Sequence, residues 1–222
     1  MKLEIAKEIL ARLWEITGEI SALPGERDLN FKITSDQCSV LKVYEDNPEN
    51  RALLSIQDRA LKALSAKIPG RVPRPVVNSD GATVLTENGK LIRLLSWLEG
   101  SMWANCESVD RELIENLGKT IALVDLNLAE IELTREENEI LDRPFIWNIL
   151  QVDAILQWAR SIPNEEIKSL VISLVTEKTK QTQEKLKLLP RQLIHNDGND
   201  WNIVVSERNL GLIDFGDMII AP

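Results

Sequence analysis

Hydrophobic and polar positions in the first part of the chain follow two different periods. Residues 3–17 place apolar side chains at three- and four-residue steps, which predicts an amphipathic helix. The segments 29–34 and 39–45 alternate apolar and polar side chains as strands do, and a short apolar segment at 19–23 precedes a turn at Pro24-Gly25. The pattern therefore predicts a helix followed by an antiparallel sheet.

A second helix and a hairpin follow. Asn47 and Pro48 are typical N-cap and first-turn residues, and the apolar side chains after them recur at helical spacing up to Leu64. Asn88-Gly89 separates two apolar runs, and this dipeptide favours a tight type I′ hairpin. The second run ends near Ser96, so we expect a strand to end there.

The pattern then becomes helical. Apolar side chains at helical spacing predict helices that begin near residues 108, 147 and 164, and the last of them reaches about residue 188. We interpret the apolar stripes of these helices as core. A strand-rich part followed by a helix-rich part predicts an α+β fold.

The strongest chemical signal lies near the C-terminal end. His195-Asn196-Asp197 is followed by four residues and then by Asn202, which is the spacing H-x-D-x-x-x-x-N of a kinase catalytic loop. Asp214-Phe215-Gly216 comes twelve residues after Asn202, beyond two short apolar runs that predict a hairpin. The alternative, a solvated polar loop ending in a turn, requires both motifs to coincide by chance. The pair points to phosphoryl transfer.

Phosphoryl transfer requires an acceptor hydroxyl placed in line and a metal ion that neutralises charge. We expect Asp197 to orient the hydroxyl and to accept its proton. Asn202 and Asp214 would supply the hard oxygen ligands that Mg²⁺ prefers. Lys42, which shares one face of a predicted strand with Val40, would hold the α/β-phosphates of ATP or GTP. The alternative for Lys42 is an exposed side chain in solvent.

A kinase pairs this lysine with a glutamate on the helix that follows. Between Glu49 and Lys62 the sequence contains no glutamate. Gln57 occupies one of the suitable positions, where its amide is able to hydrogen-bond Lys42 without supplying a counter-charge. The sequence departs from the kinase pattern at this point.

The segment Ser96-Trp97-Leu98-Glu99-Gly100 follows the predicted hairpin, where a kinase-like chain crosses from one lobe to the other. We expect the backbone at Ser96 and Leu98 to meet the nucleotide base; the alternative is that Trp97 only packs. Residues 1–97 would then form an N-lobe and residues 98–222 a C-lobe.

Composition restricts the partners. A net charge of −9 argues against nucleic acid, and no apolar run is long enough to span a membrane. Cys38 and Cys106 are too few for a disulfide framework, and a single histidine argues against a Cys/His zinc site. We therefore expect a cytoplasmic protein that acts on a small molecule, and the oligomeric state stays open.

Several segments, taken in order, resemble the aminoglycoside phosphotransferase family, and within it the hydroxylysine-kinase-like members. They are residues 25–31, 40–43, 92–100, 195–202 and 211–217. The resemblance implies a protein-kinase-like two-lobed fold, with an antiparallel sheet and a helix in the N-lobe and a mostly helical C-lobe. It implies transfer of the γ-phosphoryl group of ATP or GTP, with Mg²⁺, to a hydroxyl of a small amine or amino acid.

The resemblance also places Gly25 and Asn30 in the loop that covers the nucleotide phosphates. That loop has one glycine where protein kinases have three. Members of the family continue for several helices after the segment that matches residues 211–217. We therefore expect the C-lobe to be incomplete here, with exposed apolar surface on it.

Two other interpretations remain beside an active kinase. In the first, the chain is a non-catalytic nucleotide-binding or interaction remnant of such a kinase. In the second, it is the N-terminal part of a larger protein, because relatives of this kind also occur fused to an aminotransferase. A protein kinase fits less well, because the loop reads His-Asn-Asp instead of His-Arg-Asp and no G-x-G-x-x-G is present.

Overall fold

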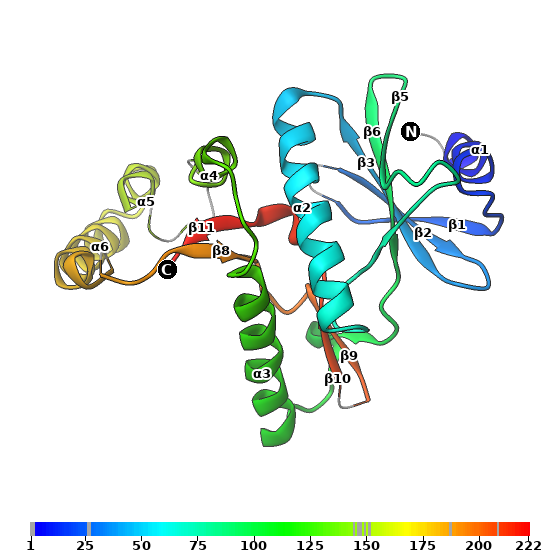
Figure 1. Cartoon of the computed structure of the whole chain (residues 1–222). Coiled ribbons are helices and arrows are strands. Elements are labelled where there is room, and N and C mark those ends of the chain that lie inside the picture. The colour runs from blue at the N-terminus through cyan, green and yellow to red at the C-terminus, as the bar shows by residue number, and fades with distance from the viewer. Residues whose placement is uncertain are drawn as a thin grey trace.

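The computed structural model of the chain describes residues 3–25, 28–143, 145, 148, 150, 152–186, 188–207 and 209–222. Strands dominate the first half of the chain and helices the second half, apart from short strands near the C-terminal end (Figure 1). This arrangement confirms the predicted α+β fold. None of the helices over these ranges combines the length and the apolar composition that crossing a membrane requires.

The first half forms one antiparallel sheet of six strands in the order β1-β2-β3-β6-β4, and β5 also pairs with β6. The strands are β1 (Glu19–Leu23), β2 (Leu29–Thr34), β3 (Ser39–Glu45), β4 (Pro75–Val76), β5 (Val84–Glu87) and β6 (Lys90–Ser96). Asn88 and Gly89 between β5 and β6 have φ values of 48° and 72°. Positive φ at both positions is what a type I′ turn requires, so the predicted hairpin is confirmed.

Helix α1 (Leu3–Trp14) covers one face of this sheet (Figure 1). The apolar face of the helix and the inward side chains of three strands form one buried cluster. Its members are Ala6, Ile9, Leu10, Trp14, Phe31, Ile33, Leu41, Val43, Ile92 and Leu94. Leu41 and Val43 point into this cluster, and because side chains alternate along a strand, Lys42 between them points to the other face.

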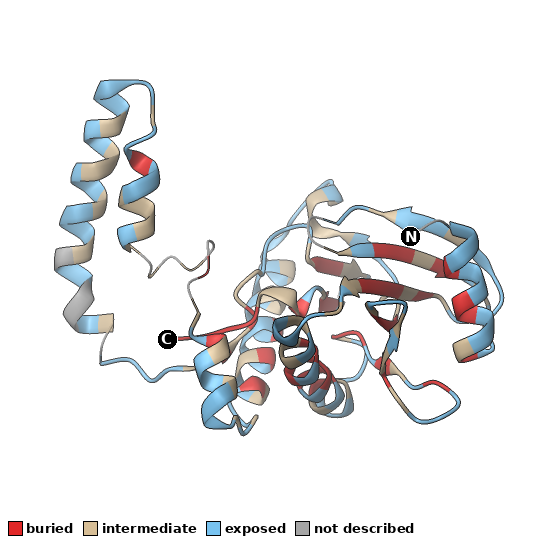
Figure 2. Cartoon of the chain, turned by 90° about the horizontal axis from the view of Figure 1, so that it is seen from above, coloured by how far each residue is buried: buried red, intermediate tan, exposed pale blue. Residues whose placement is uncertain are grey.

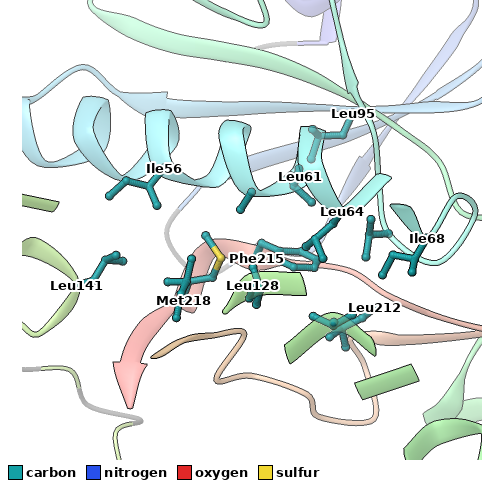
Figure 3. Packing of buried hydrophobic residues seen from close by; sticks show 14 of the residues in the cluster. Ile56, Leu61, Leu64, Ile68, Leu95, Leu128, Leu141, Leu212, Phe215 and Met218 are labelled. Carbon is teal, nitrogen blue, oxygen red and sulfur yellow. The ribbon is translucent and has the colours of Figure 1, made fainter. Parts of the chain in front are cut away.

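Helix α2 (Pro48–Lys67) lies between the sheet and the C-terminal elements (Figure 1). As predicted, Asn47 caps it: the Asn47 Oδ1 accepts a hydrogen bond of 2.8 Å from the backbone N–H of Asn50. Figure 3 shows Phe215 and Met218 on the side of α2 that carries its buried leucines. The helix therefore belongs to a core that both halves of the chain share.

The second half contains α3 (Arg111–Leu128), α4 (Arg135–Leu141), α5 (Val152–Ala159) and α6 (Glu165–Leu186). Its short strands are β7 (Ser101–Met102), β8 (Gln192–Ile194), β9 (Ile203–Ser206), β10 (Asn209–Leu212) and β11 (Ile219–Ala221), and single 3₁₀ turns lie at Trp103–Asn105 and Phe215–Asp217. The start predicted for α5, residue 147, lies outside the described residues. Helix α4 was not predicted, although Thr134 and Glu137 form a capping box at its start.

Helices α5 and α6 pack on each other and stand apart from the rest of the chain (Figure 2). Among the described residues of α6, no side chain is buried, and Ile167, Leu170 and Leu174 are exposed. The prediction that the apolar stripe of this helix is core is therefore wrong. An amphipathic pattern requires a partner for the apolar face, and here α5 covers only part of that face.

The shared core around α2 gives a direct test. Leu64 is fully buried on α2, and shortening it to alanine leaves a cavity. We expect Leu64→Ala to lower the free energy of unfolding by about 2–5 kcal/mol, measured by urea denaturation. Leu126→Ala on α3 is the control, because Leu126 is 66% exposed and its loss should change stability by less than about 0.5 kcal/mol. Equal effects of the two changes would contradict the packing described for α2.

Candidate active site

The hairpin of β9 and β10 brings the two C-terminal motifs together. Its strands pair in the register Ile203 with Leu212. One residue beyond each strand, the backbone N–H of Ile213 donates a hydrogen bond of 2.9 Å to the carbonyl oxygen of Asn202. Asn202 and Asp214 therefore lie at the same end of the hairpin, although twelve residues separate them in the sequence.

The carboxylate of Asp197 is held by hydrogen bonds within its own loop. Its Oδ2 accepts a bond of 2.6 Å from the Asn202 Nδ2, and its Oδ1 accepts one of 2.7 Å from the Asn199 Nδ2. The Asn202 amide also donates to the backbone oxygen of Asp197 at 3.0 Å. Because both partners are neutral donors, they orient the carboxylate without removing its charge.

His195 joins the catalytic loop to the Asp-Phe-Gly motif. The backbone N–H of Asp197 donates to its Nδ1 at 3.2 Å, so Nε2 carries the proton and donates to the carbonyl oxygen of Ile213 at 2.9 Å. Its ring meets that of Phe215 edge to face, with 4.5 Å between centroids. Burial of the neutral ring lowers the pKa of His195.

Asp214 and Lys42 form an ion pair that links the motif to the sheet. The Lys42 Nζ lies 3.1 Å from the Asp214 Oδ1 and 3.2 Å from the Asp28 Oδ2. Burial raises the pKa of the Asp214 carboxyl, but the charge of Lys42 outweighs burial, and the pKa lies below its ordinary value. The backbone of Asp214 is left-handed (φ 61°, ψ 69°), a conformation that costs energy in a residue other than glycine.

The same ion pairs decide the state of Lys42. Burial lowers the pKa of the Lys42 ammonium. The oxygens of Tyr44, Asp214 and Asp28 outweigh this effect, so the pKa is raised above its ordinary value. Lys42 is only 7% exposed. The alternative of a lysine in solvent is therefore excluded.

Lys42 belongs to a row of polar side chains across the sheet. In the strand register, Asn30 on β2 is opposite Lys42 on β3, and Lys42 is opposite Arg93 on β6. Cross-strand partners lie on the same face, so the three side chains share the face away from α1. All three are buried. Polar groups buried in a row of this kind are costly unless they have partners.

Gln57 does not have the partner that the sequence predicted. Its Oε1 accepts a hydrogen bond of 2.7 Å from the Arg93 Nη2, and the same guanidinium donates to the Tyr44 hydroxyl. The Gln57 side chain is therefore linked to Arg93 and not to Lys42. Sequence reasoning missed both Arg93 and Asp28. The signals for them were a charged residue in an apolar strand and an acid in the segment 25–31.

Gly25 lies before β2, and Asn30 is the second residue of that strand. The Asn30 Nδ2 donates to the carbonyl oxygen of Pro24 at 3.3 Å. A Cβ atom on Gly25 would lie 2.4 Å from the carbonyl oxygen of Asp28, so only glycine fits at this approach. The backbones of Gly25 and Asp28 therefore lie close together, next to Lys42.

The segment 96–100 connects the sheet with the catalytic hairpin. The N–H of Ser96 donates to the Arg74 carbonyl oxygen, and the Ser96 hydroxyl accepts from the Arg74 N–H, both at 2.8 Å. A Cβ atom on Gly211 of β10 would lie 2.7 Å from the Leu98 Cδ1, so Leu98 packs on the hairpin. Val40 lies half-buried on β3, on the same face as Lys42.

The residues at the end of the hairpin fit a magnesium ion. The Asn202 Nδ2 is engaged by Asp197, which leaves the Asn202 Oδ1 for a metal, and Lys42 engages one of the two carboxylate oxygens of Asp214. Within the described ranges no group of three or more His, Cys, Asp or Glu gathers into a metal site. Two protein oxygens completed by phosphate oxygens and water are typical of magnesium in nucleotide sites.

The model of the family described as "Phosphotransferase enzyme family" matches residues 19–222. The chain belongs to this family. It is 24% identical over 227 aligned positions to hydroxylysine kinase of Xenopus laevis, which it matches with 90% of its own length and 60% of that protein's. The chain therefore spans less than two thirds of this relative.

Solved structures of other phosphotransferases share the fold. An amicoumacin kinase in complex with AMP-PNP, Ca²⁺ and Ami superposes with a TM-score of 0.70 at 14% identity, covering 99% of this chain and 65% of the other. A GDP complex of an aminoglycoside 2′-phosphotransferase gives 0.72 at 16% identity, covering 100% and 74%. A microcompartment-associated aminopropanol kinase gives 0.64 at 16% identity, covering 99% and 70%. The predicted kinase-like fold is thereby confirmed.

The environment of His195 predicts how it titrates. Because its pKa is lowered by burial, the folded chain keeps the ring neutral at a pH at which the unfolded chain takes up a proton. Stability should therefore be full above about pH 6.5 and should fall as the pH drops below that value. His195 is the only histidine, so its ring signal in proton NMR is assigned without ambiguity. A midpoint at or above about 6.5 would contradict the neutral, doubly hydrogen-bonded ring.

Proposed function

We propose that this chain carries the nucleotide site and the catalytic loop of a small-molecule kinase. It transfers the γ-phosphoryl group of ATP or GTP to a hydroxyl of a small amine or amino acid. The observation that carries the proposal is the ion pair of Lys42 and Asp214, which joins a strand of the sheet to a motif 172 residues away. It gathers a phosphate-binding cation, a metal ligand and, through the hairpin, the loop of Asp197 into one site.

Each residue has a role in this proposal. Asp197 faces the acceptor hydroxyl and accepts its proton, since its carboxylate is held in place by neutral donors. Two of the three N–H donors of Lys42 face the carboxylates of Asp28 and Asp214, and the third binds the α/β-phosphates. The loop from Gly25 to Asn30 covers the phosphates. The backbone at Ser96 and Leu98, with Val40 nearby on β3, receives the base.

Mg²⁺ would be held by Asn202 and Asp214, and when bound it neutralises charge on the phosphates. The protein's own contribution is to fix these two oxygens. The hydrogen bond from Ile213 to Asn202 sets their separation along the hairpin, and His195 ties the hairpin to the catalytic loop. We divide the chain accordingly into a nucleotide-binding lobe, residues 1–97, and a catalytic lobe, residues 98–222.

The chemistry of the acceptor is supported by two observations. The relatives named above are kinases of hydroxylysine, of aminopropanol and of amicoumacin, so hydroxylated small molecules recur among them. The net charge of −9 attracts a cationic amine and repels nucleic acid. A hydroxylated amine or amino acid is therefore the acceptor that we propose.

One observation favours a second candidate. The apolar side chains Ile167, Leu170 and Leu174 of α6 are exposed. An exposed apolar face is consistent with a nucleotide-binding or interaction remnant, or with the N-terminal part of a larger phosphotransferase or phosphotransferase/aminotransferase fusion. The remnant binds Mg-nucleotide without turnover, so binding and turnover separate the two candidates.

The nucleotide site is tested by thermal unfolding. Ligand at about 100 times its dissociation constant should stabilise the chain by about 2.7 kcal/mol. We expect Mg·ATP or Mg·GTP to raise the melting temperature, and we expect Asp214→Ala to lose the Mg-dependent part of the rise. Asp36→Ala, a change of an exposed carboxylate in the turn between β2 and β3, is the control. No shift with either nucleotide would remove the proposed function.

The catalytic role of Asp197 predicts a separation of binding from turnover. Asp197→Asn keeps the shape of the side chain but removes the base, so transfer should fall by about 10²–10⁴-fold while Mg-nucleotide binding persists. Phosphorylated product is measured with hydroxylysine, ethanolamine and aminopropanol as acceptors. Asp200→Asn makes the same change at an exposed position in the same loop and should leave the rate unaltered. Normal turnover by Asp197→Asn would show that another group accepts the proton.

A further inference from the structure

The lysine of a kinase site needs an anionic partner that holds it toward the phosphates, and the usual partner is a glutamate on the following helix. This chain has none between Glu49 and Lys62. Gln57 occupies one of the suitable buried positions on α2, and its amide oxygen accepts a hydrogen bond from Arg93. The neighbouring acid on α2, Asp58, pairs with the Lys62 Nζ at 2.7 Å and accepts a hydrogen bond from the Thr83 hydroxyl. The carboxylates that contact Lys42 in the described part of the chain therefore lie outside α2.

The charge comes from the other side of the lysine. Asp28, directly before β2, places its Oδ2 3.2 Å from the Lys42 Nζ. The side chain of Lys42 is 9% exposed and that of Asp28 17%, so the pair is largely shielded from water. Asp214, the second carboxylate on Lys42, shares its charge with the metal in the proposed function. Of the two carboxylates, Asp28 is then the one that pairs with Lys42 and does not also bind the metal.

Arg93 explains why a glutamate on α2 is not needed for packing. It lies opposite Lys42 in the strand register and is 2% exposed. Its guanidinium reaches Gln57 on the helix and Tyr44 on the strand, so it bridges α2 to the sheet by itself. No acid in the described part of the chain forms an ion pair with it, and its Nη1 is buried without a hydrogen-bond partner.

We propose that Asp28 is the positioning residue of Lys42, in place of the helix glutamate, while Arg93 and Gln57 hold α2 to the sheet. This inference rests on the proposed function, in which Lys42 meets the nucleotide phosphates. In other kinases one lysine–glutamate ion pair both positions the lysine and holds the helix to the sheet. Here Asp28 would do the first and Arg93 with Gln57 the second. The position of the lysine is then governed by the loop that covers the phosphates and not by the helix.

The first test is a double-mutant cycle in the full chain, with Mg·AMP-PNP as the probe and isothermal titration calorimetry as the measurement. We expect Asp28→Asn to weaken binding about tenfold, because Lys42 loses a charge-assisted bond. In a Lys42→Met background the same change should weaken binding less than about twofold, since Asp28 acts only through Lys42. Asp36→Asn is the matched control for the loss of one acid.

Two results of the cycle would overturn the proposal. An equal effect of Asp28→Asn in both backgrounds would show that Asp28 acts without Lys42. Tighter binding by Asp28→Asn would show that Asp28 competes with phosphate for Lys42. The combination of Asp28→Asn with Gln57→Glu separates loop from helix: because Gln57 faces Arg93, the second change should not restore binding. Restored binding would place the partner of Lys42 on α2.

A second test needs no nucleotide. Acetylation of Lys42 by an N-hydroxysuccinimide ester, followed by mass spectrometry, reports how firmly its ammonium is held, with exposed Lys119 as internal reference. We expect Asp28→Asn to speed acetylation of Lys42 several-fold and Asp36→Asn to leave it unchanged. An unchanged rate in Asp28→Asn would overturn the proposal. If the wild-type chain bound no Mg·AMP-PNP, the proposed function would fail, while acetylation would still decide whether Asp28 holds Lys42.

Discussion

The buried ammonium of Lys42 is the group to which the rest of the site is fitted. A single charge taken out of water costs several kcal/mol unless partners surround it. Two carboxylates provide that compensation, and they come from the start of β2 and from the C-terminal motif. Folding therefore cannot bury Lys42 without bringing these distant segments together. The ion pairs that compensate the buried charge also assemble the site.

Apolar packing around α2 gives this electrostatic arrangement a rigid frame. One face of the sheet is sealed by α1, so the polar row of Asn30, Lys42 and Arg93 faces the other way. On that side α2 shares a core with Phe215, the middle residue of the Asp-Phe-Gly motif, and with Met218. A helix fixed in this way is poorly suited to move relative to Lys42. A partner for the lysine on a loop is consistent with that constraint.

Local signals in the sequence predicted local structure well. Asn47 with Pro48 and the Asn88-Gly89 turn specify their conformations through their own backbones, and the two apolar runs between the C-terminal motifs predicted the hairpin. Asp28 and Arg93 were missed because their partners lie on other elements, at a distance in the sequence over which no local pattern acts. The exposure of α6 was missed for a related reason. Its pattern shows that one face needs a cover, but not how much of that face α5 covers.

The hairpin that carries Asn202 and Asp214 determines which insertions and deletions keep the distance between these two side chains. Its register, and not the number of residues in its turn, sets the separation of the two side chains. Residues added at the tip, after Ser206, would lengthen the loop and leave the distance between Asn202 and Asp214 as it is. One residue removed from within β9 would instead turn every later side chain of that strand to the opposite face.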